Sequence, residues 1–336
     1  MKPRVDVIVP CFNYGSLLEV CVDSVRSQEG VAVRVLVMDD ASTDETEAVG
    51  RRLSAADPRV EFRRHSSNHG HIATYNEALA LIAGDYCMVL SADDLLTPGA
   101  LARATRLMEA HPGVGLVYGG DIPFRDTPPL DGPRVVAGGW RITSYVEFLS
   151  AACRLGHTGI QSPTALVRTA VHRRIGDYLP ELPHSGDTEI WLRMAADSMV
   201  GQLDADQAFR RLHSSSMSLG YSPLRRLEEQ KRAFDLHFQR QAPLPPEIAA
   251  LRPVVHRTIA ESAFWNAVQA FERGDSSTCA AFLGFASRTS PGIESWDAWR
   301  RLQWKQRIGP AACRLIEPLA ARARRLALPG AHRSVS

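Results

Sequence analysis

Residues 33–46 read VRVLVMDDASTDET, and this stretch indicates the fold class. Its first part, 33–38, is a nearly continuous run of β-branched and aliphatic side chains, as expected of a strand buried on both faces of a parallel sheet. Asp39 and Asp40 follow where the strand should end, and Ser42 with Glu45 has the spacing of a capping box that opens a helix. The stretch therefore predicts a β-α unit.

The same pattern repeats on both sides of this unit. Further strands are predicted at 5–9, 60–64 and 86–91, and the helices between them at 16–28, where Ser16 and Glu19 make a second capping box, 71–83 and 99–110. Regular alternation of strands and helices predicts an α/β fold with an open, mostly parallel, Rossmann-like sheet flanked by helices over about the first 120 residues.

The second half of the chain has a different organisation. Residues 121–133 are rich in turn-forming residues and predict a loop, after which strands at 164–168 and 207–212 and a helix at 187–196 are expected. Beyond residue 221 only helices are predicted, near 223–240, 246–273, 276–287 and 310–327. A domain boundary is therefore expected between residues 221 and 222.

Composition limits the classes of function. The chain has 336 residues, a formal net charge of +2, 45% hydrophobic residues and 23% charged residues, typical of a globular protein and too nearly neutral for nucleic-acid binding. Six scattered cysteines predict buried thiols in a reducing compartment. The N-terminus lacks the apolar core of a signal peptide, and no run of about 18 apolar residues occurs, so cytoplasmic location is expected.

Acidic residues follow several predicted strands. Asp39 and Asp40 follow one, Asp93 and Asp94 follow another, and Asp187 opens a later helix. Ligands of open parallel sheets bind beyond the carboxyl ends of the strands, so these side chains are expected to converge. Carboxylates so close repel one another unless a cation intervenes, which suggests a divalent metal and a phosphate ligand. Simple capping of helix N-termini is the alternative.

Six stretches in order resemble the inverting family 2 glycosyltransferases of GT-A fold. They are VIVPCFN (7–13), VMDDASTDET (37–46), NHGHIATYNEAL (68–79), MVLSADDLLTPGAL (88–101), SGDTEIWLRMA (185–195) and RLHSSSMS (211–218). The resemblance covers about residues 3–220. It implies a GT-A domain over 1–221, with nucleotide-sugar binding in 1–120 and the acceptor and catalytic part in 121–221, followed by a helical region over 222–336.

The resemblance also implies roles for individual residues. Those implied to bind the nucleoside and ribose of the donor are Pro10, Phe12, Asn13, Asp40 and Asp93. An aromatic ring can lie on the base, and a carboxylate can accept the imide N–H of uracil or thymine, which favours a UDP- or dTDP-sugar over an adenine nucleotide. The residues implied to hold Mg²⁺ or Mn²⁺ are Asp93, Asp94 and His213. Which of the two aspartates binds the metal stays open, because Ser91 replaces the first aspartate of the family's DxD motif, and His213 can also be a structural histidine.

Asp187 matches the family's catalytic base, although Gly186 replaces the glutamate that usually precedes it. It would take the proton of an acceptor hydroxyl during a single displacement that inverts the anomeric configuration. An N-cap role for Asp187 is the alternative, and Glu189 is the substitute base. Two other functions remain open, a non-catalytic nucleotide-sugar-binding protein and a sugar nucleotidyltransferase.

Two further clusters are less informative. His65, His69 and His71 lie close in sequence but lack a cysteine or acidic companion at ligand spacing, so a zinc site is not expected. Eight basic residues against Glu317 alone lie between Arg300 and Arg325, with tryptophans nearby, and indicate either a solvated helix face or peripheral contact with the inner face of a membrane. Neither the acceptor, whether glycan, lipid-linked or small molecule, nor the oligomeric state is identified.

Overall fold

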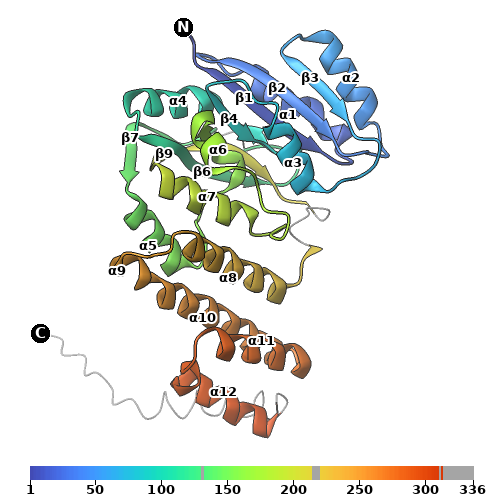
Figure 1. Ribbon diagram of the computed structural model, residues 1–336. Helices are drawn as coiled ribbons and strands as arrows, with labels where there is room; N and C mark the ends of the chain where they lie inside the picture. Colours follow the sequence, from blue (N-terminus) through green and yellow to red (C-terminus); the bar gives the residue numbers. More distant parts are fainter. Residues whose placement is uncertain (130–131, 214–219, 310–311, 313–336) are drawn as a thin grey trace, which may run out of the picture. The chain divides into compact units, whose positions relative to one another are not determined.

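The computed structural model describes residues 1–129, 132–213, 220–309 and 312. Its contacts divide the chain into two compact units, the first covering Met1–Val255 and the second beginning at His256. Figure 1 labels the helices and strands of both units.

The described part of the first unit is built on a nine-stranded sheet of order β3-β2-β1-β4-β8-β6-β9-β5, with β7 also paired to β9. The strands are β1 (Arg4–Cys11), β2 (Ala32–Asp39), β3 (Val60–Arg64), β4 (Tyr86–Val89), β5 (Leu95–Leu96), β6 (Val114–Phe124), β7 (Val135–Thr143), β8 (Leu166–Arg168) and β9 (Met199–Arg211). The pairs β1–β2, β2–β3, β1–β4 and β6–β9 are parallel. Because β8 is antiparallel to both β4 and β6, strands β1 to β4, β6 and β9 all run in one direction. The predicted, mostly parallel α/β sheet is confirmed.

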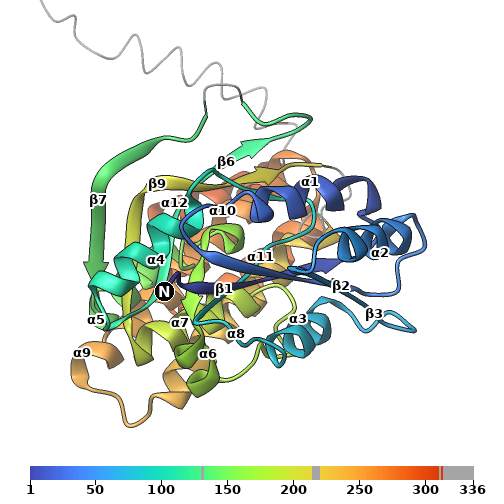
Figure 2. The same ribbon diagram turned by 90° about the horizontal axis from the view of Figure 1, so that it is seen from above.

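Helices cover both faces of this sheet, as Figure 2 shows. One face carries α1 (Gly15–Arg26), α2 (Thr46–Ala56) and α4 (Ala100–Ala110), and the other carries α3 (His71–Leu79) and α7 (Gly186–Asp197). Strand β1 explains why both faces are covered. Val5, Val7 and Val9 pack into the core beneath α1, whereas Asp6, one residue out of phase, accepts hydrogen bonds from the backbone N–H groups of Ala83 and Gly84 at 2.6 and 3.0 Å.

Helix α8 (Pro223–Arg240) packs against α7 within the first unit. Glu189 of α7 is fully buried, and its carboxylate binds Arg193 of the same helix at 2.7 Å and Arg240 of α8 at 2.9 Å. The other described helices that lie wholly in this unit are α5 (Tyr145–Leu155), η1 (Ser162–Thr164), α6 (Thr169–Ile175) and α9 (Pro246–Ala249). The change to helices alone occurs at residue 223 as predicted, but the compact unit extends to Val255 because α8 is joined to α7.

The second unit is helical in its described part. It contains most of α10 (Leu251–Glu272), then α11 (Ser276–Thr289), η3 (Ile293–Ser295) and α12 (Asp297–Ile308). Phe264 stacks on Trp299 with ring centroids 5.6 Å apart, and the guanidinium of Arg257 lies 4.2 Å from the ring centroid of Trp296. The predicted helix at 310–327 lies outside the described residues. Of the helices that the structure describes, none is long and apolar enough to cross a membrane.

Both predicted capping boxes are wrong. The N-cap of α1 is Tyr14, and the N–H of Gly15 instead donates to the carboxylate of Asp44, 29 residues away, at 2.9 Å. Helix α2 begins at Thr46, so Ser42 lies before it and accepts a hydrogen bond from the N–H of Asn13 at 2.9 Å. The loops after β1 and β2 therefore hydrogen-bond to each other at the N-termini of the two helices. Tertiary contacts therefore replace the local pairs that the sequence spacing suggested.

The region from 121 to 143 contains more strand than predicted. Strand β6 continues to Phe124, paired with β9 along its length, and β7 adds on the other side of β9. The long β9 begins at Met199, well before the predicted strand at 207–212. These strands form because segments distant in sequence pair with one another, and both pairings contain register shifts. The turn-forming residues of this region gave no indication of that pairing.

Candidate active site

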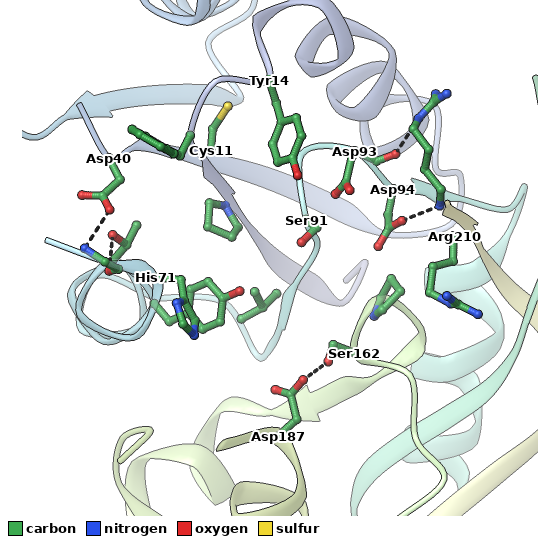
Figure 3. Close-up of a pocket in the computed structure, with 18 of the residues that line it drawn as sticks. Cys11, Tyr14, Asp40, His71, Ser91, Asp93, Asp94, Ser162, Asp187 and Arg210 are labelled. Atoms are coloured by element: carbon green, nitrogen blue, oxygen red, sulfur yellow. Dashed lines mark hydrogen bonds between the residues drawn. The ribbon is translucent and has the colours of Figure 1, made fainter. Parts of the chain in front are cut away.

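A cavity of about 610 Å³ lies beyond the carboxyl ends of β1, β2 and β4. This size falls within the range of small-molecule sites. In Figure 3, Asp40 lies at one end of the cavity, Asp93 and Asp94 lie toward the other end, and Asp187 lies across from them. Four of the five acidic residues predicted to converge, Asp40, Asp93, Asp94 and Asp187, therefore line one cavity. Asp39 does not, because its fully buried carboxylate pairs with Arg64 at 2.7 Å.

Asp40 is held in its charged form by the loop that follows β3. It is 4% exposed, and its carboxylate accepts hydrogen bonds from the Nδ1 of His65 at 2.8 Å and from the N–H groups of His69 and Gly70 at 2.7 and 2.9 Å. Burial alone would raise the pKa of Asp40, but these hydrogen bonds outweigh it and lower the pKa. Within the part of the chain that the structure describes, the Oδ2 atom accepts only the Gly70 bond, which leaves it able to accept one more.

The other residues expected at the nucleoside divide into two groups. Pro10 and Phe12 line the cavity, and Phe12 is 45% exposed, so part of it is open to a ligand. Asn13 is not among the lining residues. Its Oδ1 accepts from the N–H of Thr43 at 2.8 Å, and its φ of 59° is in the left-handed region. Asn13 thus joins the loops after β1 and β2.

Asp93 and Asp94 form a buried acidic pair, 9% and 6% exposed. Asp94 accepts from the N–H of Arg211 at 2.9 Å, and the Arg211 side chain donates to the carbonyl oxygen of Asp93 at 3.2 Å. Burial, and then the negative charge of Asp93, raise the pKa of Asp94 to about 8. Two carboxylates are the ligands that Mg²⁺ or Mn²⁺ takes beside substrate phosphates. The pair fits such a metal.

His213 lies beside this pair. Its Nε2 is 2.8 Å from Oδ2 of Asp93, and its ring meets that of Tyr14 edge to face at 5.6 Å. Among the described residues, ligand atoms of Asp93, Asp94 and His213 do not gather within 4.8 Å of one another. The structure therefore brings His213 to Asp93, a predicted metal ligand, without assembling a three-residue ligand set among the described residues.

Asp187 projects from the first turn of α7 into the cavity. Ser162 donates a hydrogen bond to its Oδ2, and Tyr178 donates another to its carboxylate. Burial raises the pKa of Asp187 despite these two bonds. Both alternatives for this helix are wrong: the N-cap is Ser185, and Glu189 is bound to two arginines away from the cavity.

Sequence reasoning missed four residues that complete the site: Ser162, Tyr178, Arg210 and Arg211. Arg210 lines the cavity and pairs with Asp121 at 2.7 Å. The two arginines end β9, with Leu212 between Arg211 and His213, and their position at a strand end could have indicated a role in the site. Ser162 and Tyr178 carried no such signal, because their proximity to Asp187 arises only from the packing of η1 and the loop after α6 against α7.

Comparison with known proteins agrees with this geometry. Residues 6–176 match the model for Glycosyl transferase family 2. A Campylobacter jejuni GalNAc(5)-diNAcBac-PP-undecaprenol beta-1,3-glucosyltransferase is 33% identical over 118 residues, which cover 35% of this chain and 38% of that protein. Of this relative and two other curated proteins that it matches, the chain spans only 15 to 38% of the length.

Two solved structures are similar over most of the chain. S. aureus TarS 1-349 in complex with UDP-GlcNAc has a TM-score of 0.65 and 17% identity, over 86% of this chain and 82% of that one. The mannosyltransferase PcManGT from Pyrobaculum calidifontis, in complex with GDP-Man and Mn²⁺, has a TM-score of 0.56 and 20% identity, over 94% and 88%. They support the GT-A fold with a C-terminal helical region. With its family match over half of the sequence and its acidic cavity at the carboxyl ends of the strands, this chain belongs to glycosyl transferase family 2.

Proposed function

We propose that the protein transfers a single sugar from a nucleotide diphosphate sugar to an acceptor hydroxyl, with inversion at the anomeric carbon. The observation that carries this proposal is the position of Asp187 across the cavity from Asp93 and Asp94 (Figure 3). A single displacement needs the base and the leaving group on opposite sides of the reacting carbon. A diphosphate bound at the acidic pair and an acceptor beside Asp187 meet that requirement.

The nucleoside of the donor occupies the end of the cavity formed by Phe12 and Asp40. The half-exposed ring of Phe12 stacks on the base, and the remaining acceptor position of Asp40 Oδ2 takes an imide N–H. Asp40 is charged at neutral pH because its pKa is lowered, so it acts as an acceptor and not as a donor. Uracil and thymine carry an N–H of this kind, and a UDP- or dTDP-sugar is the donor that this arrangement favours.

Asp93 and Asp94 hold a divalent cation together with the donor's diphosphate and ribose. Bound Mg²⁺ or Mn²⁺ supplies Lewis-acid stabilisation of the negative charge that develops on the departing β-phosphate. Arg210 lines the same end of the cavity and offers a second positive charge to the diphosphate. His213 orients Asp93 through its hydrogen bond to Oδ2.

Asp187 is the general base. Its carboxylate removes the proton from the acceptor hydroxyl as that oxygen forms a bond to the anomeric carbon and the bond to the β-phosphate oxygen breaks. The hydrogen bonds from Ser162 and Tyr178 fix the direction of the carboxylate, so a free lone pair faces the cavity. The raised pKa of Asp187 makes it a stronger base than an exposed aspartate would be.

The test is a panel of nucleotide sugars with the purified protein, scored for release of nucleoside diphosphate with Mn²⁺, with Mg²⁺ and with EDTA. We expect turnover with a UDP- or dTDP-sugar, loss of turnover in EDTA, and inverted configuration in the product. Asp187→Asn should bind donor as the wild type does while losing about 10²–10⁴-fold in turnover, the usual contribution of a general base. Near-wild-type turnover of this variant would contradict the base assignment, and binding of donor without turnover of any acceptor or water would support a non-catalytic donor-binding protein.

A further inference from the structure

A second group of metal-binding side chains lies behind Asp40, at the end of the cavity away from the acidic pair. His65 follows β3, His69 lies in the loop that follows, and Glu77 is on α3. One ligand atom from each of the three lies within 4.8 Å of the other two, and among the described residues no other trio of histidine, cysteine or acidic side chains meets this criterion. The sequence hid the group, because the acidic member is eight positions beyond His69 and reaches it only through the turn into α3.

Asp40 fixes which nitrogen of His65 is free to bind a cation. The Nδ1 atom lies 2.8 Å from Oδ1 of the charged Asp40 carboxylate and therefore carries a proton. In the neutral imidazole the Nε2 atom then has the lone pair, and it faces Oε2 of Glu77 at 3.0 Å. Two acceptors cannot face each other at that distance unless a positive charge lies between them. Either a second proton or a metal ion must therefore occupy the space between His65 and Glu77.

The surroundings of these two atoms favour a metal ion. His65 is 8% exposed and its ring cannot turn away without losing the Asp40 bond, whereas His69 and Glu77 are exposed and can adjust. The His69 ring lies against the His65 ring with centroids 4.3 Å apart, so a small rotation brings one of its nitrogens to the same ion. A carboxylate that orients a histidine whose other nitrogen binds a metal is the usual support of such a ligand.

We propose that His65, His69 and Glu77 bind one Zn²⁺ ion, with water as the fourth ligand. Two imidazoles and one carboxylate suit Zn²⁺, which is commonly four-coordinate, and they do not suit Mg²⁺, which prefers oxygen ligands and octahedral geometry. The ion ties the loop at 65–70 to α3. This loop also supplies two N–H groups to Asp40. The ion therefore stabilises the side of the cavity at which the nucleoside is proposed to bind.

This site is distinct from the metal proposed at Asp93 and Asp94, so its test does not depend on transferase activity. The full chain, free of any histidine tag, is stripped of metal with a chelator and titrated with Co²⁺, whose visible absorption reports four-coordinate geometry. We expect one equivalent to bind with that spectrum and to be displaced by Zn²⁺. The His69→Ala and Glu77→Gln variants should each weaken binding at least tenfold. Both side chains are exposed, so these substitutions should leave the fold intact.

Two further variants serve as controls. His157→Ala removes an exposed histidine that is not part of the group and should leave Co²⁺ binding unchanged. Asp94→Asn removes a carboxylate of the acidic pair and should leave the four-coordinate Co²⁺ spectrum unchanged. The proposal is wrong if Co²⁺ gives no four-coordinate spectrum with the wild type or if Zn²⁺ does not displace it. It is also wrong if His69→Ala and Glu77→Gln bind Co²⁺ as the wild type does. In either case a proton joins His65 to Glu77.

Discussion

Replacing Tyr178 with phenylalanine should move the acid limb of the pH–rate profile to higher pH. The Tyr178 hydroxyl donates to the Asp187 carboxylate, and this bond lowers a pKa that burial has raised. Without it the protonated carboxyl is relatively favoured, so the pKa of Asp187 rises further. A general base works only when deprotonated, and activity should therefore be lost at a higher pH than in the wild type.

The size of the change in pKa follows from the strength of the lost bond. A hydrogen bond to a charged group contributes about 1.5–3 kcal/mol, and one pKa unit corresponds to about 1.4 kcal/mol, so the pKa should rise by about one to two. Ser162 still donates to Oδ2 in the variant, so the lower end of this range is expected. At pH values well below the pKa of the base, a rise of one in that pKa lowers kcat/KM about tenfold.

The assay is kcat/KM for the best donor measured from pH 5 to 9 at saturating metal. Tyr86→Phe is the matched control, because it removes a tyrosine hydroxyl that donates to the carboxylate of Glu109 at 2.6 Å, away from the cavity. That control should leave the limb in place. Ser162→Ala should move it in the same direction as Tyr178→Phe. If the Tyr178→Phe limb coincides with that of the wild type or moves to lower pH, Asp187 is not the group that the limb reports.

Three other substitutions test the donor site and the fold. Phe12→Ala should weaken binding of the nucleoside diphosphate, measured by calorimetry, by about 1–3 kcal/mol, which is the usual contribution of aromatic stacking on a base. An unchanged Kd would show that the base does not stack on Phe12. Asp94→Asn should raise the Mn²⁺ concentration for half-maximal turnover by at least about tenfold. An unaltered Mn²⁺ titration would show that Asp94 does not bind the metal. Gly15→Ala should lower the free energy of unfolding by about 1–3 kcal/mol in urea, because a Cβ there would lie 2.6 Å from the backbone N of Thr46. The adjacent Ser16→Ala should change it by less than about 0.5 kcal/mol, since Ser16 is exposed and caps nothing; equal losses from both would contradict the contact with Thr46.

The sequence predicted the parallel half of the sheet well because the information there is local. Residues 60–64 form β3 as predicted, and the helix at 223–240 agrees to the residue. Buried strands need continuous apolar runs, and the helices between them need amphipathic spacing, so both leave a pattern in the sequence. For the same reason Asp40, Asp93 and Asp94, which follow strands, could be placed in one cavity from the sequence alone.

What the sequence could not predict depends on contacts between distant segments. The hydrogen bond from Gly15 to Asp44 replaces a capping box, and the pairing of β6 with β9 converts a turn-rich region into strand. The partners of Asp187 likewise come from separate segments, with Ser162 in η1 and Tyr178 after α6. Spacing within one element carries no information about such contacts.

The link between Glu189 and Arg240 determines where the folded catalytic unit can end. Glu189 is fully buried on the helix that carries Asp187, and one of its two arginine partners comes from α8. A fragment that stopped at residue 221 would leave part of this charge without its partner, a loss that commonly costs about 3–5 kcal/mol for a buried pair. Such a fragment should lose order first in α7, the helix that carries Asp187. The shortest independent transferase that could be cut from this chain therefore includes α8.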